Sequence, residues 1–121
     1  MEKLALEYYK NGYNCSQCIL KAAADRFDIV LPKKCLNMCC GINNGFGVGS
    51  VCSVLVAAII TLGLFFNEQS LKRVRINFLN DFNSKYGSLN CAQLKSKNNC
   101  EEIITDVAQI LEKIILSKSN I

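Results

Sequence analysis

Apolar residues recur at every third or fourth position along most of this chain, which is the spacing that places them on one face of an α-helix. The clearest stripe predicts a helix over residues 100–116. Its apolar positions are Ile103, Ile104, Val107, Ile110, Leu111 and Ile114. A similar stripe predicts a helix over residues 69–86, which Gly87 and Ser88 end, and a short turn is expected over residues 90–94.

The first third of the chain contains three shorter helical patterns and no strand pattern. Residues 2–11 give the first helix, which Gly12 ends, and residues 15–27 give the second. Pro32 suits the first turn of a helix, so the third is predicted over residues 33–40. At the other end of the chain, residues 117–121 are expected to fray.

The run from residue 51 to residue 66 carries no charge and is the most hydrophobic part of the chain. It has sixteen residues, whereas a membrane span needs about 20. A buried central helix therefore explains it better than a membrane span, and the glycine-rich residues 41–50 form a loop before it. Together the patterns predict an all-α fold: a single domain over residues 1–121, built as a compact bundle of about five to six helices around an apolar central helix.

The composition fits a globular protein and limits the classes of partner that it is expected to bind. The 121 residues are 50% hydrophobic and 20% charged, which is enough for a core and argues against disorder. The net charge of +4 comes from scattered basic residues. No basic stripe is present, so no nucleic-acid partner is expected. The N-terminal segment has acidic residues and no apolar run of signal length, so we expect a cytoplasmic protein.

The chain has eight cysteines and no histidine. The lack of histidine excludes imidazole base catalysis, Cys-His pairs and the zinc fingers that use histidine. Attachment of a c-type haem is excluded too, because Ile19 follows Cys18 where that motif requires histidine. In a reducing compartment, cysteines in this number are more often metal ligands or redox thiols than a disulfide framework.

The motif Asn-Cys-x-(Gln/Glu) occurs three times and places Cys15, Cys91 and Cys100 directly after an asparagine. Asparagine favours the N-cap of a helix, and a Gln or Glu three residues later can bond back to the cap. Cys52 lies two residues after another candidate cap, Ser50. A helix N-terminus offers free N–H groups and the positive end of the dipole, which favour a thiolate. We therefore predict that these four cysteines form a thiolate site at one end of the bundle.

Four thiolates in one place repel one another, so a cation or pairing into disulfides must stabilise them. An iron–sulfur cluster or a zinc ion would provide the cation. A structural four-cysteine zinc site usually combines two close pairs of cysteines. Here only Cys15 and Cys18 are close, so the spacing favours a cluster while zinc remains open. The alternative to any site is that the cysteines are small buried hydrophobic residues.

The remaining cysteines allow other interpretations. Cys15 and Cys18 form a C-x-x-C at the start of a helix, which is the arrangement of a dithiol redox pair. Cys35, Cys39 and Cys40 are interpreted as apolar filling, with a second thiol site as the alternative.

Three glycines at alternate positions, Gly45, Gly47 and Gly49, lead into the apolar run. A nucleotide-binding loop is not supported, because no strand precedes them and no Lys-Ser/Thr pair follows. Their small size would instead let the backbone approach a bulky anionic group such as a cluster.

The order of these motifs resembles the C-GCAxxG-C-C family of redox-active proteins, which is related to the non-haem part of split-Soret cytochromes. The resemblance rests on Cys15, the glycine loop, Cys52, the segment Tyr86-Gly87-Ser88-x-x-Cys91-x-x-Leu94, and Cys100. It implies a helical fold, a redox role and an iron–sulfur cluster, with the family's four cysteines at positions 15, 52, 91 and 100.

The chain also departs from the family pattern. Ser53 and Ala57 are taken to replace two family glycines after Cys52, which would leave less space beside a cofactor. The family's four cysteines do not include the four others of this chain, Cys18, Cys35, Cys39 and Cys40.

We therefore expect a small redox protein that binds an iron–sulfur cluster, most simply [2Fe–2S], through the four family cysteines, with the loop glycines shielding one side. It would transfer electrons or sense redox state with a partner protein, as a carrier or binding module and not necessarily as an enzyme. One alternative is a thiol–disulfide oxidoreductase with Cys15 as the attacking thiolate and Cys18 as the resolving thiol. Another is a structural zinc-binding interaction module. The extent of apolar surface suggests a homodimer, with Phe65 and Phe66 as contacts.

Overall fold

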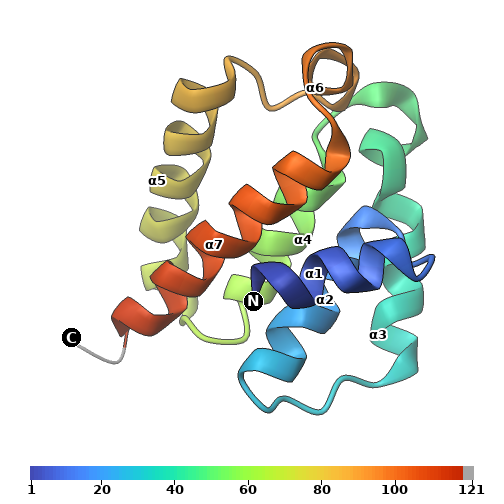
Figure 1. Cartoon of the computed structure of the whole chain (residues 1–121). Coiled ribbons are helices and arrows are strands. Elements are labelled where there is room, and N and C mark those ends of the chain that lie inside the picture. The colour runs from blue at the N-terminus through green and yellow to red at the C-terminus, as the bar shows by residue number, and fades with distance from the viewer. Residues whose placement is uncertain (119–121) are drawn as a thin grey trace.

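The computed structural model describes residues 1–118, in which it has seven α-helices and no β-strand (Figure 1). The helices are α1 (Glu2–Lys10), α2 (Cys15–Arg26), α3 (Lys33–Met38), α4 (Ser53–Leu62), α5 (Glu68–Tyr86), α6 (Cys91–Lys97) and α7 (Cys100–Lys118). The predicted all-α bundle is confirmed. It has one helix more than expected, because the turn predicted over residues 90–94 continues as α6.

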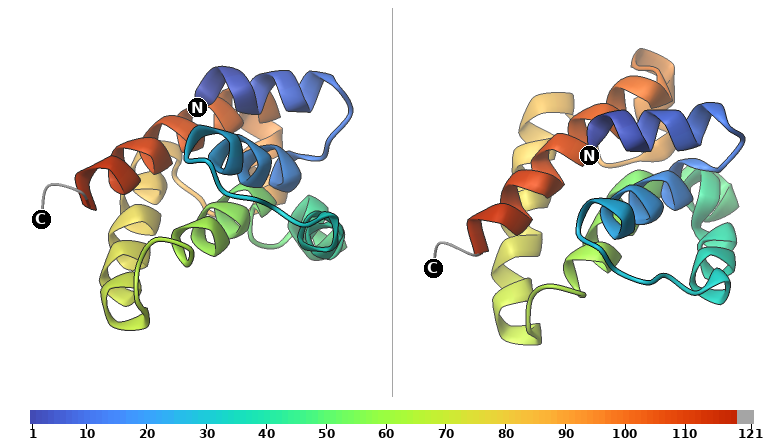
Figure 2. Two further views of the ribbon diagram at one scale, coloured as in Figure 1. Left: turned by 90° about the horizontal axis from the view of Figure 1, so that it is seen from below. Right: turned by 60° about the horizontal axis from the view of Figure 1, so that its bottom comes forward.

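The central helix is α4. Helix α2 packs along it, α7 crosses it and α5 contacts its far side, so that α3 and α5 lie on opposite sides of the central helices (Figures 1 and 2). The buried residues of α4 are Ser53, Val54, Leu55, Ala57, Ala58, Thr61 and Leu62. Since every one of them is apolar or small, the helix can be surrounded by its neighbours without burying a charge.

Helix α4 is shorter than the predicted range 51–66, and the chain around it explains why. Val51 forms an isolated antiparallel bridge with Asn90, and the Cys52 N–H donates to the Leu89 carbonyl at 2.9 Å. These bonds hold the backbone before Ser53 in an extended form. At the other end the helix stops at Leu62, before the turn that begins at Gly63.

Helices α1 and α7 cover the core from one side. The predicted stripe on α7 is largely buried: Ile103, Ile104, Val107 and Leu111 are at most 3% exposed. The Met1 amino group and Arg26 both pair with Glu112, at 3.2 Å and 2.8 Å, and so join α1 and α2 to α7. Of the tail that was expected to fray, Ser117 and Lys118 are helical, and residues 119–121 lie outside the described part.

Helix α5 contributes Phe78 and Phe82 to the core, and Lys85 pairs with Asp106 of α7 at 2.7 Å. Within residues 1–118, no helix combines the length and hydrophobicity needed to cross a membrane.

The two phenylalanines proposed as dimer contacts both have partners in their own chain. Phe65 packs edge-on against Phe27, and the Lys118 ammonium lies over the Phe66 ring. The homodimer stays a prediction.

Candidate functional site

Cys15 is the first residue of α2, and the capping box predicted before it is present. The Gln17 N–H donates to the Asn14 Oδ1 at 2.9 Å, and the Asn14 N–H donates back to the Gln17 Oε1 at 3.3 Å. The reciprocal pair fixes the first turn of α2 and with it the direction of the Cys15 side chain.

Cys91 is the first residue of α6, but its cap is simpler than predicted. The Asn90 Oδ1 accepts from the Ala92 N–H at 3.2 Å. Gln93 does not close the capping box, because its Oε1 accepts from the Ser88 hydroxyl at 2.5 Å. The Ser88–Gln93 hydrogen bond therefore stabilises the turn before α6, and Asn90 alone caps the helix.

Cys100 and Cys52 begin the other two helices of the site. Cys100 is the first residue of α7, where the Asn99 Oδ1 accepts from the Glu102 N–H at 2.7 Å. Cys52 is itself the N-cap of α4, so the prediction that Ser50 would cap this helix is wrong. All four cysteines therefore stand at a helix start, where the first N–H groups lack partners within the helix.

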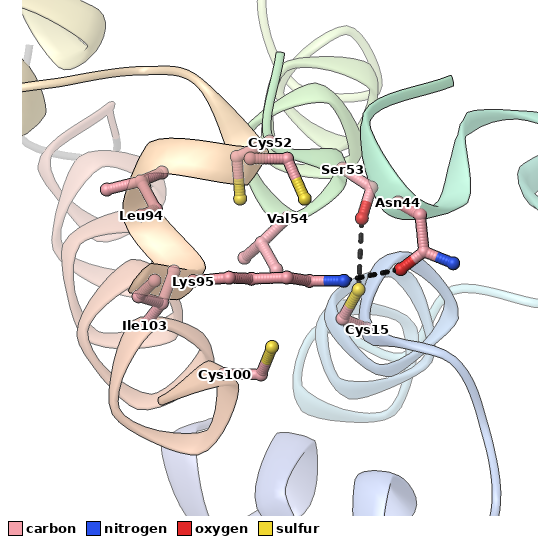
Figure 3. Close-up of a pocket in the computed structure, with 10 residues that line it drawn as sticks. Cys15, Asn44, Cys52, Ser53, Val54, Leu94, Lys95, Cys100 and Ile103 are labelled. Carbon is pink, nitrogen blue, oxygen red and sulfur yellow. Dashed lines mark hydrogen bonds between the residues drawn. The ribbon is translucent and has the colours of Figure 1, made fainter. Parts of the chain in front are cut away.

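The four cysteines line one pocket, which is a cavity of about 20 Å³, close to the space that holds one water molecule. In Figure 3 the sulfurs of Cys15, Cys52 and Cys100 turn toward the same space. The other lining residues are Asn44, Ser53, Val54, Leu94, Lys95 and Ile103. Among residues 1–118, the lining thus contains four thiols and one ammonium group but no carboxylate.

The four thiols line the same pocket, but they are not arranged with the geometry of a metal-binding site. Within residues 1–118, no group of three or more Cys, Asp or Glu side chains is placed to hold a metal ion. All eight cysteines are free thiols. A metal group bound by the four thiols would therefore have to draw their side chains inward.

The Cys15 sulfur has two polar neighbours, the Ser53 hydroxyl at 2.9 Å and the Asn43 Oδ1 at 3.3 Å (Figure 3 shows the first). The Asn43 Oδ1 can only accept, so the thiol donates to it and the Ser53 hydroxyl donates to the sulfur. Ser53 is 1% exposed, and this bond to Cys15 gives its buried hydroxyl a partner.

The electrostatics at Cys52 differ from the sequence-based expectation. Burial raises the pKa of the Cys52 thiol to about 11, although the Leu55 and Val54 amides act in the opposite direction. The neighbouring thiols Cys15 and Cys91 add to the rise. The helix start alone therefore does not ionise Cys52, and a thiolate there needs a cation.

Sequence reasoning missed two residues beside the thiols. Tyr9 reaches them from α1, and burial, followed by the nearby Cys100 and Cys15, raises the pKa of its phenol. Lys95 lies one turn after Cys91 on α6, and its Nζ donates to the Asn44 Oδ1 at 2.6 Å (Figure 3). Predicting α6 as a helix would have placed Lys95 on the face of Cys91. No signal in the sequence points to Tyr9.

The glycine loop supports the start of α6. Gly45 is buried at φ +61°, and a Cβ there would lie 2.5 Å from the Ser50 nitrogen and 2.9 Å from the Cys91 Cβ. Gly49 also packs against α6, whereas a Cβ on Gly47 would meet no atom within 4 Å. None of the three lines the pocket, to which the loop contributes Asn44. Their role in shielding a cofactor stays a prediction.

The other four cysteines lie outside the pocket. Cys18 is 0% exposed, and its thiol donates to the Tyr13 carbonyl at 3.6 Å. Burial raises the pKa of the Cys18 thiol to about 12, which makes it a poor resolving thiolate for Cys15. Cys35 and Cys39 line a separate apolar cavity of about 200 Å³, and Cys40 is exposed.

Comparison with known proteins finds a match to a protein family. No curated protein and no solved structure matches the chain. A family model described as "Putative redox-active protein (C_GCAxxG_C_C)" matches residues 13–114, which include all four pocket cysteines.

The replacement of two family glycines by Ser53 and Ala57 stays a prediction. Since the family model covers most of the chain, this protein belongs to the redox-active C_GCAxxG_C_C family.

Proposed function

We propose that this protein binds a [2Fe–2S] cluster through Cys15, Cys52, Cys91 and Cys100 and uses it for electron transfer or redox sensing. The observation that carries the proposal is that four separate helix starts place their thiols around one pocket. Membership of a redox-active family supports the same conclusion.

The chemistry of the donor set fits such a group. Thiolates are the ligands that iron–sulfur clusters and zinc prefer, and in the described part of the chain no carboxylate that would favour a hard cation lines the pocket. The cavity of about 20 Å³ is too small for a two-iron core. Loading therefore requires its walls to move.

When bound, the cluster would supply one-electron chemistry, and the chain would hold it and set its surroundings. The Ser53 hydroxyl, at 2.9 Å, holds the Cys15 sulfur in place. Val54, Leu94 and Ile103 provide an apolar wall. Such a wall limits water at the cluster, which influences its reduction potential.

Anaerobic purification followed by metal and sulfide analysis tests the proposal. We expect a brown protein with iron and acid-labile sulfide in equal amounts, about two of each per chain. Dithionite should bleach its visible absorbance. As a control, Cys40→Ser removes an exposed thiol outside the pocket and should leave the iron content unchanged.

Two results would contradict a cluster. The first is a colourless protein without iron even after anaerobic reconstitution with iron and sulfide. The second is zinc at one ion per chain in the natively purified protein, which would instead make it a structural zinc-binding module.

A further inference from the structure

Lys95 and Asn44 connect α6 to the glycine loop across the edge of the four-cysteine pocket. The Lys95 Nζ donates to the Asn44 Oδ1 at 2.6 Å, and both residues line the pocket. Figure 3 shows the Lys95 side chain extended between Leu94 and Ile103 on one side and Cys15 and Asn44 on the other. The Lys95 side chain thus belongs to the lining of the pocket that the four thiols share.

Among residues 1–118, the charge of Lys95 has no acidic partner. Within the described residues 1–118, no carboxylate lies within ion-pair distance of Lys95, and its hydrogen-bond partner is the neutral amide of Asn44. Asn44 has φ +58°, a left-handed conformation that asparagine tolerates better than most residues. The loop therefore presents a neutral acceptor that holds the ammonium near the thiols without cancelling its charge.

Four thiolates around an oxidised two-iron core carry a net charge of about −2, and one-electron reduction makes it about −3. A nearby cation stabilises the reduced form more than the oxidised form, because the attraction grows with the charge. For the same reason, a cation at this place strengthens the binding of any divalent metal that four thiolates hold.

We infer that Lys95 is the charge-compensating residue of this pocket, held in position by Asn44, and that it raises the reduction potential of the bound cluster. The inference rests on the proposed function for the cluster, and extends to any thiolate-bound metal in the same pocket. In this role Lys95 contributes charge and no ligand atom, and Asn44 is the residue that positions it.

The test compares Lys95→Gln with Lys97→Gln in the reconstituted protein. Lys97 is an exposed lysine on the same short helix and does not line the pocket. For Lys95→Gln, the ratio of reduced to oxidised cluster at a fixed potential should fall about threefold to tenfold, where tenfold corresponds to about 59 mV. Lys97→Gln should leave the ratio unchanged. The difference between wild type and Lys95→Gln should shrink at high salt, because Lys95 is exposed.

A second measurement separates this inference from the cluster itself. Cadmium is titrated into the metal-free proteins, and its thiolate charge-transfer absorbance is followed. Lys95→Gln should bind Cd²⁺ several-fold more weakly than wild type, and Lys97→Gln should bind it equally well. Asn44→Ala should reproduce part of the loss, because it removes the tether and keeps the charge.

The outcomes are distinct. If the wild type binds Cd²⁺ but never iron, the proposal of a cluster is wrong. The role of Lys95 in charge compensation then still holds, provided that Lys95→Gln binds Cd²⁺ more weakly than wild type. If wild type and Lys95→Gln both bind a cluster and its reduction potential is the same in the two proteins, the inferred role of Lys95 is wrong and the proposal of a cluster stands. A wild type that binds neither would overturn both.

Discussion

Two sulfur-lined cavities in this molecule show how the neighbours of a cysteine decide what it can do. The first holds Cys15, Cys52, Cys91 and Cys100 and measures about 20 Å³. The second measures about 200 Å³. It is lined by Leu20, Leu31, Cys35, Met38, Cys39, Ile60 and Leu64. Both are lined by thiols, but among the described residues only the first is also lined by an ammonium group, a hydroxyl and a side-chain amide.

The cysteines of the first cavity come from four helix starts, where free N–H groups and a nearby ammonium can stabilise negative charge. In the second cavity the thiols come from one short segment, and their neighbours are aliphatic. Burial, followed by Cys40 and Cys35, raises the pKa of the Cys39 thiol. A thiol in that setting stays protonated and packs as a small apolar side chain.

The sharpest test of this comparison replaces one buried cysteine of each cavity by alanine. Cys91→Ala and Cys39→Ala remove side chains that are 6% and 3% exposed, so each should cost about 1 kcal/mol of stability. Cys91→Ala should lose nearly all bound iron after anaerobic reconstitution, because a ligand is missing, whereas Cys39→Ala should keep it. Equal iron contents in the two variants, measured per folded chain, would remove the distinction between the cavities.

The glycine loop offers a second test with a matched pair. Gly45 and Gly47 both have positive φ, at +61° and +77°, but only a Cβ on Gly45 would meet backbone, 2.5 Å from the Ser50 nitrogen. Gly47→Ala should cost about 1 kcal/mol from strain alone, and Gly45→Ala about 3 kcal/mol or more. Urea unfolding of the metal-free protein measures both. Similar midpoints would show that the loop does not brace the start of α6 as described.

The periodicity of the sequence was sufficient for the long helices. The stripes of α5 and α7 and the caps of α2 and α7 are local features, so the pattern predicted them. It failed where distant residues decide the backbone. Helix α4 begins late because Val51 bridges to Asn90, and no local pattern shows a partner that far along the chain.

The residues of the candidate site also differ in whether local sequence features could predict them. The sequence identified the four cysteines, because the asparagine caps and the family motif are written in neighbouring residues. Lys95 could have been placed on the face of Cys91 only by predicting α6 as a helix, and its contact with Asn44, 51 positions away in the chain, leaves no local signal. Nor could the sequence show that Cys18, one turn after Cys15, would be 0% exposed, because that burial depends on how α2 packs against other helices.

Cys18 provides a smaller effect that tests the alternative redox function. Cys18→Ser places a more polar hydroxyl in a fully buried position, where the Tyr13 carbonyl is its acceptor, and should lower the free energy of unfolding by about 1–2 kcal/mol, with iron binding unchanged. Cys40→Ser, at an exposed position, should be neutral. If Cys15 and Cys18 were instead a catalytic dithiol, Cys18→Ser would trap a mixed disulfide at Cys15. Mass spectrometry of the protein after exposure to a disulfide substrate detects that product.

The smallest expected effect compares two helix caps of the same kind. The Asn14 and Asn67 side chains each accept from a backbone N–H three residues later, at 2.9 Å from Gln17 and 2.8 Å from Ser70. Replacing either by alanine should lower the free energy of unfolding by about 1 kcal/mol, as measured by urea unfolding of the metal-free protein. The two substitutions should therefore cost the same stability at different places, since Asn14 precedes Cys15 and Asn67 precedes the first residue of α5.

Because of that location, only Asn14→Ala should affect the pocket. Loss of the cap lets the first turn of α2 fray, and the Cys15 sulfur then spends part of its time away from the other thiols. A chelator should therefore remove iron from Asn14→Ala about fivefold faster than from wild type, a change equivalent to about 1 kcal/mol, while Asn67→Ala should release it at the wild-type rate. If both variants released iron equally fast, global stability and not the placement of the cysteine would control retention, and the helix start would lose its special role in this site.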